Sequence, residues 1–243
     1  DPAGTARAGR LIRQLGVDSH VEDIAPVLEQ AGCYRRRDEA VQRLFPDHRP
    51  GGRFKIALAG GLADLERLNY FNLIVELPDG SVQTRRMPAD VYLQVVAATN
   101  MKQRVRKMIE YYHAERLNYA VLGTPNKLEY ELGFFVRGGD GLADLKPIAH
   151  LYKTQVYALA EYLGVPEEIR NQPPSTDTYA LPQTQEEFYF TLPAHIIDAL
   201  LLAFATRKPY TIPETLSLSA AQANRLLRDV ERKRRLAARL HSA

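Results

Sequence analysis

Cysteine, net charge and long hydrophobic runs are all scarce in this chain. Its single cysteine, Cys33, excludes an intramolecular disulfide framework and a cysteine-rich zinc site. Its apolar runs are much shorter than a membrane-spanning helix, and it does not open with a basic and then apolar leader. We therefore expect no membrane partner and a reducing, cytoplasmic location. The net charge of +3 also gives little reason to expect a nucleic-acid partner.

What the chain does contain is the composition of a folded globular protein. Its 243 residues are 45% hydrophobic and 25% charged, which provides enough apolar material to bury a core. Neither an internal repeat nor a low-complexity tract divides the sequence. We therefore treat residues 1–243 as one α/β domain.

Strand and helix signals alternate along much of the chain. Short apolar segments at 20–24 and 117–122 predict strands, and apolar residues at helical spacing predict helices at 5–15 and 154–163. The segment 117–122 runs directly into the polar loop Gly123–Lys127. A strand, a polar loop and a helix in this order are typical of a ligand site at the carboxyl edge of a parallel sheet.

Residues 46–96 differ from their surroundings, and we interpret them as an insertion or lid. The segment opens with several prolines and glycines, and two runs of strand-like residues flank the turn Pro78-Asp79-Gly80. These two runs, 71–77 and 81–86, predict a β-hairpin.

Two longer helices are predicted after the hairpin. The residues that follow Ala89 predict a helix whose apolar face carries Val105, Met108, Ile109 and Tyr112. The region 217–243 predicts a C-terminal helical tail that a capping box between Ser219 and Gln222 opens.

The stretch most suggestive of chemistry lies between Gly123 and Lys153. It holds Glu129, Asp140 and Asp144, with several glycines between them. Carboxylates and a lysine near a strand-end loop suit a magnesium-nucleotide site, because Mg²⁺ prefers oxygen ligands and an ammonium neutralises phosphate charge. The residues alone leave the alternative open that these are solvated surface charges.

Several motifs in this region resemble those of the NAD synthetases, in the same order and at similar spacing. Residues 123–129, Gly-Thr-Pro-Asn-Lys-Leu-Glu, are similar to the family's Gly-Thr-Gly-Asn-Lys-Ser-Glu element. Residues 139–144, Gly-Asp-Gly-Leu-Ala-Asp, resemble its Gly-Asp-Gly-Gly-Ala-Asp stretch. Asn100, Arg104 and Arg106 resemble its Asn-x-x-x-Arg-x-Arg helix. Further similar segments are 147–156, 163–166, 173–175 and the pair Lys233-Arg234.

The resemblance implies a fold and a reaction. NAD synthetases are ATP-pyrophosphatases with a Rossmann-like parallel sheet flanked by helices, so we expect this α/β fold with the β-hairpin region inserted. The family makes NAD from deamido-NAD, ATP and ammonia through an acyl-adenylate, and it releases AMP and pyrophosphate. The resemblance further implies ATP and Mg²⁺ as cofactors and a homodimer as the assembly.

The same resemblance implies a role for each matching residue. Glu129 would bind magnesium, and Thr124 would line the ATP site. Lys153 and Ser175 would hold the ATP phosphates, while Asp140 would lie beside the nicotinate and the incoming ammonia. Asp140 and Lys153 are thus the expected catalytic residues. The expected dinucleotide-binding residues are Asn100, Arg104, Arg106, Asp140, Lys233 and Arg234.

These assignments have structural alternatives. Arg104 and Arg106 lie on opposite flanks of the predicted helix, so one of them can be merely solvated. Asn100 can be a helix cap. Lys233 and Arg234 lie in a basic run that is otherwise typical of an exposed helix face.

The chain departs from the family in two respects. The Ser-Gly-Gly-x-Asp-Ser phosphate loop, which follows the family's first strand, is absent, and Ala57–Asp64 imitates it poorly. We therefore expect an N-terminal segment upstream of Asp1 that carries the first strands and this loop. The second departure is the insertion at 46–96, which leaves two other functions open. One is an amide ligase acting on a different carboxylate, and the other is a non-catalytic nucleotide-binding homologue.

The nitrogen source and one further alternative follow from what the chain lacks. Its length leaves no room for a glutaminase domain, so we expect free ammonia or a separate glutaminase partner to supply the nitrogen. A nucleic-acid binder with a basic tail is the weakest alternative, because the tail is short and lacks interleaved aromatic residues.

Overall fold

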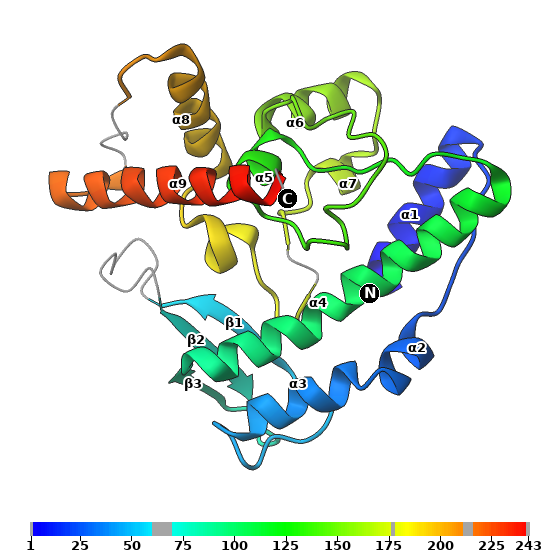
Figure 1. Ribbon diagram of the computed structural model, residues 1–243, viewed down its shortest axis with the longest axis vertical. Helices are drawn as coiled ribbons and strands as arrows, with labels where there is room; N and C mark the ends of the chain where they lie inside the picture. Colours follow the sequence, from blue (N-terminus) through cyan, green and yellow to red (C-terminus); the bar gives the residue numbers. More distant parts are fainter. Residues whose placement is uncertain (1, 60–69, 176–177, 211–215, 242–243) are drawn as a thin grey trace.

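The computed structural model describes residues 2–59, 70–175, 178–210 and 216–241 as a mixed α/β structure dominated by helices (Figure 1). The helices are α1 (Pro2–Leu15), α2 (Ala25–Gln30), α3 (Cys33–Gln42), α4 (Ala89–Leu117), α5 (Lys127–Leu132), α6 (Lys153–Tyr162), α7 (Glu167–Arg170), the π-helical turn η2 (Glu186–Phe190), α8 (Ala194–Thr206) and α9 (Ala220–His241). A small sheet packs near the start of the long helix α4, and α9 lies on the other side of the molecule beside α5 and α8.

The sheet is built from the segment predicted as an insertion. Its strands pair antiparallel in sequence order, as β1 (Phe54–Leu58), β2 (Phe71–Glu76) and β3 (Val82–Arg86). The predicted hairpin is the β2–β3 pair, and Gly80 in its turn takes a φ of 81° that favours glycine. Ile56, Leu73 and Val75 are fully buried, whereas β3 is exposed along its length.

The helix α4 runs for 29 residues without a break. Its first half presents Val91 and Val95 to a core shared with α3 and the sheet. Its second half differs from the prediction, because Met108 and Tyr112 are exposed while Lys107 is buried with its ammonium against Glu110. The apolar spacing predicted the helix correctly but not its covered face, which depends on what packs against it.

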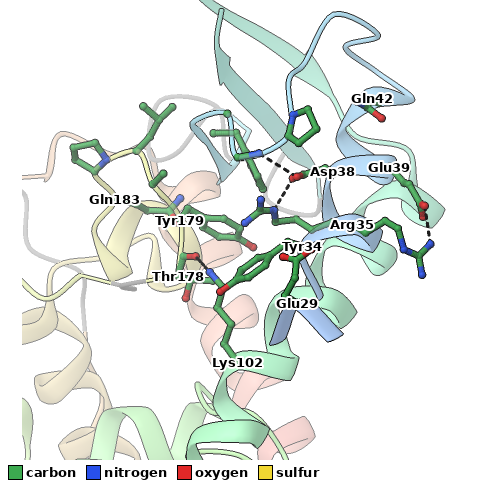
Figure 2. A pocket seen from close by; sticks show the side chains of 18 of the residues that line it. Glu29, Tyr34, Arg35, Asp38, Glu39, Gln42, Lys102, Thr178, Tyr179 and Gln183 are labelled. Atoms are coloured by element: carbon green, nitrogen blue, oxygen red, sulfur yellow. Dashed lines mark hydrogen bonds and ion pairs between the residues drawn. The ribbon is translucent and has the colours of Figure 1, made fainter. Parts of the chain in front are cut away.

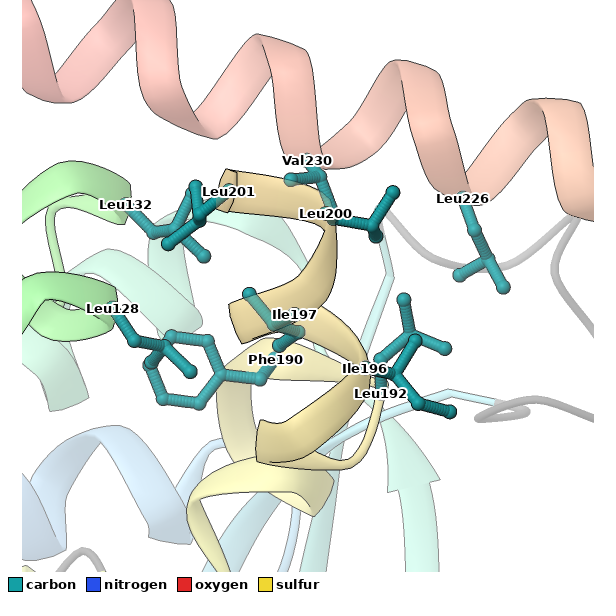
Figure 3. Close-up of a cluster of buried hydrophobic side chains, with 10 residues drawn as sticks. All are labelled: Leu128, Leu132, Phe190, Leu192, Ile196, Ile197, Leu200, Leu201, Leu226 and Val230. Carbon is teal, nitrogen blue, oxygen red and sulfur yellow. The ribbon is translucent and has the colours of Figure 1, made fainter. Parts of the chain in front are cut away.

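A second core joins α5, η2, α8 and α9. Figure 3 shows its buried side chains between these helices: Leu128, Leu132, Phe190, Leu192, Ile196, Ile197, Leu200, Leu201, Leu226 and Val230. Full burial of a Leu or Ile side chain contributes about 1.5–3 kcal/mol. Because Glu129 lies between two of these leucines on α5, this core fixes the helix that carries the predicted magnesium ligand.

The predicted parallel sheet is not formed in the part of the chain that the structure describes. Residues 20–24 are irregular, and the segment 117–122 pairs only through a single parallel bridge with Leu145. Val21 is 85% exposed and Tyr119 is 71% exposed. A strand forms where a neighbour's backbone satisfies its N–H and C=O groups, and the described residues offer these segments no neighbouring strand beyond that single bridge. The mixed α/β class is therefore confirmed, and the sheet that the described residues form is the three-stranded antiparallel one.

The last helix, α9, begins where its capping box predicts. Gln222 N donates to Ser219 Oγ at 3.2 Å, and Ser219 N donates to Gln222 Oε1 at 2.9 Å. None of the described helices, α9 included, is both long and apolar enough to cross a membrane. The phosphate-loop imitation at Ala57–Asp64 lies mostly outside the described residues, which stop at Ala59 and resume at Tyr70.

Candidate active site

Glu129 lies in the first turn of α5, directly after the polar loop. Asn126 caps this helix, because its Oδ1 accepts from Glu129 N at 3.1 Å while Glu129 Oε2 accepts from Asn126 N at 3.1 Å. The other carboxylate oxygen, Oε1, accepts from Lys153 Nζ at 3.3 Å and from Gln185 Nε2 at 3.4 Å. The capping box thus holds the Glu129 carboxylate against a lysine from another helix.

Lys153 is the first residue of α6, and α8 holds its backbone. Asp198 of α8, which is 5% exposed, accepts from Lys153 N at 3.2 Å and from Thr154 N at 2.8 Å. A carboxylate at these N–H groups also complements the positive end of the helix dipole. The side chains of Lys153 and Glu129 are only 16% and 14% exposed, so neither is a solvated surface charge.

Asp140 lies in a tight loop between two glycines that have no room for a side chain. A Cβ at Gly139 would lie 2.8 Å from a side-chain carbon of α4, and one at Gly141 would collide with the Phe135 ring. Asp140 Oδ1 accepts from Val136 N at 2.7 Å. Desolvation by the surrounding protein raises the pKa of the Asp140 carboxyl, although the residue itself is exposed at the surface of the loop.

Asn100, Arg106 and Asp140 meet at one pocket. This pocket, which we call the aromatic pocket, has a volume of about 230 Å³ and lies between α4 and the loop after α5. Most of its apolar wall is formed by Phe71, Tyr92, Phe134, Phe135, Phe188 and Tyr189. Aromatic faces with an arginine at one side suit a flat ring that bears a carboxylate.

Other predicted residues lie elsewhere. Arg104 is exposed and donates through Nε to Arg137 O at 3.2 Å, and it is not among the residues that line the aromatic pocket. Thr124 is exposed on the loop before α5. Ser175 lines a different and larger pocket. Of the two arginines, Arg106 is the one that lines the aromatic pocket.

Lys233 and Arg234 hold α9 to the rest of the chain. Lys233 Nζ donates to Tyr189 O at 2.6 Å and pairs with Asp229 at 2.6 Å. Burial lowers the pKa of the Lys233 ammonium, and Asp229 opposes that shift. Arg234 donates to Glu131 of α5 at 3.1 Å. Lys233 does not line the aromatic pocket itself, but it donates to the backbone of Tyr189, which does.

For magnesium, the described residues offer the Glu129 carboxylate, which contacts the Lys153 ammonium. Among the described residues, no group of three or more His, Cys, Asp and Glu side chains gathers closely enough to hold a metal ion. Mg²⁺ is usually held by one or two carboxylates, with phosphates and waters supplying its other ligands. Glu129 fits that mode, since its hydrogen bonds of 3.1 to 3.4 Å leave lone pairs of the carboxylate available.

Known proteins of one family resemble this chain over most of its length. The family model described as NAD synthase matches residues 71–237. The chain is 53% identical over 237 residues to the NH3-dependent NAD+ synthetase of Rhizobium meliloti (strain 1021), covering 97% of this chain and 71% of that protein. The chain belongs to the NAD synthase family. Its identity to the NH3-dependent NAD+ synthetase of Mesorhizobium japonicum is 50% over 234 residues, covering 96% of this chain and 73% of that protein.

The fold of this NAD synthase family member has a counterpart among solved structures. The NMN synthetase from Francisella tularensis matches it with a TM-score of 0.58 and 23% identity, covering 96% of this chain and 71% of that chain. At that level of identity the likeness concerns the fold alone. The mixed α/β arrangement is therefore one that a solved protein also adopts.

Sequence reasoning did not single out Asp198 or Gln185, which both contact the Glu129–Lys153 pair or its backbone. Asp198 is the lone carboxylate in the apolar run Ile196–Leu201, and a charge in such a run is a signal that could have found it. Gln185 carries no comparable signal. It comes to lie beside Glu129 only because η2 packs near α5.

Proposed function

We infer that this chain is an ammonia-dependent NAD synthetase, an amide-forming ligase that uses ATP. The observation that carries the inference is its 53% identity, over 97% of its length, to an NH3-dependent NAD+ synthetase. The NAD synthase family model, which matches residues 71–237, agrees with it. The reaction converts the nicotinate carboxylate of deamido-NAD into the carboxamide of NAD.

The proposed reaction has two steps. A carboxylate oxygen of deamido-NAD attacks the α-phosphorus of ATP, and the bond from that phosphorus to pyrophosphate breaks, which leaves an acyl-adenylate. Ammonia then attacks the acyl carbon, the bond from that carbon to the AMP oxygen breaks, and one proton is lost. Adenylation is needed because a carboxylate is a poor electrophile and has no good leaving group.

The proposed ATP side of the site is the Glu129–Lys153 pair together with Ser175 and Thr124. The ammonium of Lys153 neutralises phosphate charge as pyrophosphate departs, and Asp198 holds it in place through the backbone of α6. The carboxylate of Glu129 would hold Mg²⁺, which supplies charge neutralisation at the phosphates when it is bound.

The proposed nicotinate side is the aromatic pocket. Its rings hold the pyridine ring, and Arg106 and Asn100 orient the substrate. Asp140 lies at the same pocket, and its raised pKa makes its carboxylate a better acceptor for the proton that ammonia loses. Before adenylation, the negative charge of the nicotinate carboxylate would repel the Asp140 carboxylate. Adenylation removes that charge from the acyl group, so the repulsion is weaker when ammonia attacks in the second step.

The test is a product assay on the purified protein. ATP, Mg²⁺, ammonium and deamido-NAD are supplied together, and AMP, pyrophosphate and NAD are quantified by chromatography. We expect the three products in equal amounts, and no NAD when ammonium is replaced by glutamine. As a control for the carboxylate, nicotinate mononucleotide is tested in place of deamido-NAD. A protein that forms AMP with another carboxylate but makes no NAD would be an amide ligase of different specificity.

A further inference from the structure

The π-helical turn η2 touches both sides of the proposed active site. Gln185, the residue that precedes η2, donates through Nε2 to Glu129 Oε1 at 3.4 Å. Phe188 and Tyr189 of η2 line the aromatic pocket. A displacement of η2 would therefore change the surroundings of the carboxylate to which we assign magnesium, and also the walls to which we assign the nicotinate ring.

The conformation of η2 needs support from the elements around it. π-Helical turns are rare, and Thr191, which follows η2, has a left-handed φ of 70°. Strained backbone persists only where surrounding contacts determine it. Tyr189 Oη donates to Leu132 O at 2.8 Å, which ties the end of η2 to α5. Contacts at the beginning of η2 come from the strand β1.

Strand β1 holds the segment of the chain that leads into η2. Leu181 N donates to Phe54 O at 3.4 Å, and the buried Gln183 side chain donates to Ile56 O. Figure 2 shows Tyr179 and Gln183 of this segment at the larger of the two pockets, where the Tyr179 ring lies 5.5 Å from that of Phe54. These contacts guide the chain along β1 to the start of η2.

Lys55 of β1 connects the strand to η2 itself. Its ammonium lies 2.7 Å from Glu187 Oε1 and donates to Pro182 O at 3.1 Å. The side chain of Lys55 is 19% exposed and that of Glu187 is 35% exposed, so water and salt screen this ion pair less than a fully solvated one. One ammonium thus holds both η2 and the segment that enters it.

We propose that the Lys55–Glu187 ion pair is a positioning contact of the active site. Through η2 it holds Gln185 against the Glu129 carboxylate, and it fixes the part of the aromatic pocket wall that η2 contributes. Neither Lys55 nor Glu187 lines the aromatic pocket, so the pair acts through η2 and not on the substrate. The proposal rests on the NAD synthetase function inferred above, and it gives the three-stranded sheet a role in the reaction.

Glu187→Gln tests this contact, because it removes the charge and keeps the size of the side chain. The matched control is Glu76→Gln on β2, since Glu76 is 31% exposed and pairs with Arg53 at 2.9 Å. Loss of a partly exposed ion pair changes an equilibrium constant roughly two- to fivefold. We expect Glu187→Gln to raise the KM for deamido-NAD, and the Mg²⁺ concentration for half-maximal activity, by roughly this factor. Glu76→Gln should leave both at wild-type values, while calorimetry should show similar small losses of stability in the two variants.

Gln185→Ala tests the last step of the connection. Removing a hydrogen-bond partner of a metal ligand typically weakens metal binding by roughly tenfold or more. We expect the Mg²⁺ requirement of Gln185→Ala to rise by about tenfold. Its KM for deamido-NAD should stay near that of wild type, because Gln185 does not line the aromatic pocket. An unchanged Mg²⁺ requirement would overturn the link from η2 to Glu129.

Variants of Lys55 show whether the charge pair is the cause. Lys55→Arg keeps the charge and should stay close to wild type, whereas Lys55→Met should change both constants at least as much as Glu187→Gln. The double variant Lys55→Met/Glu187→Gln should be no worse than Lys55→Met alone, because the same contact is lost only once. Additive effects, or equal constants in Glu187→Gln and Glu76→Gln, would overturn the positioning role. A wild-type protein that makes no NAD would overturn the function itself, so the two failures are distinguishable.

Discussion

Lys153 Nζ lies 3.3 Å from Glu129 Oε1, although 24 residues separate the two along the chain. Each residue belongs to the first turn of its helix, and each is held by a separate device: a capping box for Glu129 and the buried Asp198 for Lys153. The two side chains are largely buried and neutralise each other. In the proposed reaction, the Lys153 ammonium would contact an ATP phosphate instead of Glu129, and the Glu129 carboxylate would then be available to hold magnesium.

Substitution of Lys153 should impair adenylation strongly. Removing one charged group that stabilises a departing oxyanion typically lowers the rate about 10²–10³-fold. We expect a loss of this size in kcat/KM for ATP with Lys153→Ala, and a smaller loss with Lys153→Arg, which keeps the charge. Pyrophosphate release measured under initial-rate conditions checks both. Equal activity of wild type and Lys153→Ala would contradict the assignment.

Substitution of Glu129 separates its structural role from its proposed magnesium role. Glutamine can replace glutamate in a capping box, whereas alanine cannot. We expect Glu129→Gln to keep the unfolding midpoint near that of wild type but to need more Mg²⁺ for half-maximal activity. Glu129→Ala should also lose about 0.5–2 kcal/mol of stability. Unchanged magnesium dependence in Glu129→Gln would assign the residue to structure alone.

The raised pKa of Asp140 should be visible in the pH dependence of catalysis. Its carboxyl ionises above the ordinary aspartate pKa of 3.8, so the acid limb of kcat/KM for ammonia should fall above that value. Asp140→Asn should abolish this limb and lower kcat. The variant keeps an oxygen that can accept from Val136 N, so its loop should remain in place. A limb that persists in the variant would belong to another group.

The raised pKa of Asp140 also means that this residue lowers the stability of the fold at neutral pH. Because the folded-state pKa of Asp140 is raised, its contribution to stability is present while the carboxyl is protonated and is lost as pH rises through that raised pKa. We therefore expect Asp140→Asn to unfold at a higher temperature than wild type at pH 7. The difference should shrink on acidification below the ordinary aspartate pKa. Calorimetry at several pH values measures it.

Asp198 should be a positioning residue whose loss reaches the site through Lys153. Removing a buried charged acceptor of two backbone N–H groups costs about 1–3 kcal/mol. We expect Asp198→Ala to lose that amount in urea unfolding and to raise the KM for ATP. Asp198→Asn can keep one of the two hydrogen bonds. Its stability and its KM for ATP should therefore lie between those of Asp198→Ala and wild type. A stability loss with an unchanged KM would limit Asp198 to a structural role.

Local motifs predicted the parts of the site that a short loop or one helix defines. Gly139 and Gly141 are needed because neighbouring atoms fill the space of a Cβ, and Asn126 and Glu129 form a capping box within four residues. Helical geometry predicts that Arg104 and Arg106 lie on opposite flanks of α4, and Arg106 is the one that lines the aromatic pocket.

Contacts between distant elements could not be predicted in the same way. Asp198 accepts hydrogen bonds from two residues of α6 that lie 44 and 45 positions earlier in the chain. No local motif in the sequence indicates that α8 packs against the start of α6. The predicted strand at 20–24 failed for a related reason, since apolar residues give a segment the propensity for a strand but not a partner. Lys233 was predicted to bind the substrate. In the structure its ammonium pairs with Asp229 and donates to Tyr189 O.

Backbone strain at Thr191 gives the last prediction. Thr191 ends η2 with a φ of 70°, a left-handed conformation that β-branched residues rarely adopt, and its buried Oγ1 has no hydrogen-bond partner among the described residues. Such strain costs roughly 1–3 kcal/mol, and glycine's extra chain entropy offsets roughly 0.5–1 kcal/mol of the relief. We therefore expect Thr191→Gly to stabilise the protein by about 1 kcal/mol in urea unfolding.

The matched control for this change is Arg207→Gly. Arg207 ends α8 with a φ of 55°, but it is exposed, is not β-branched and buries no hydroxyl. Its replacement should stabilise the protein less than that of Thr191. A loss of stability in Thr191→Gly beside a gain in Arg207→Gly would mean that packing of the threonine outweighs its strain. Because Phe188 and Tyr189 of the same turn line the aromatic pocket, a rise in the KM for deamido-NAD in Thr191→Gly would show that the strained turn shapes the site.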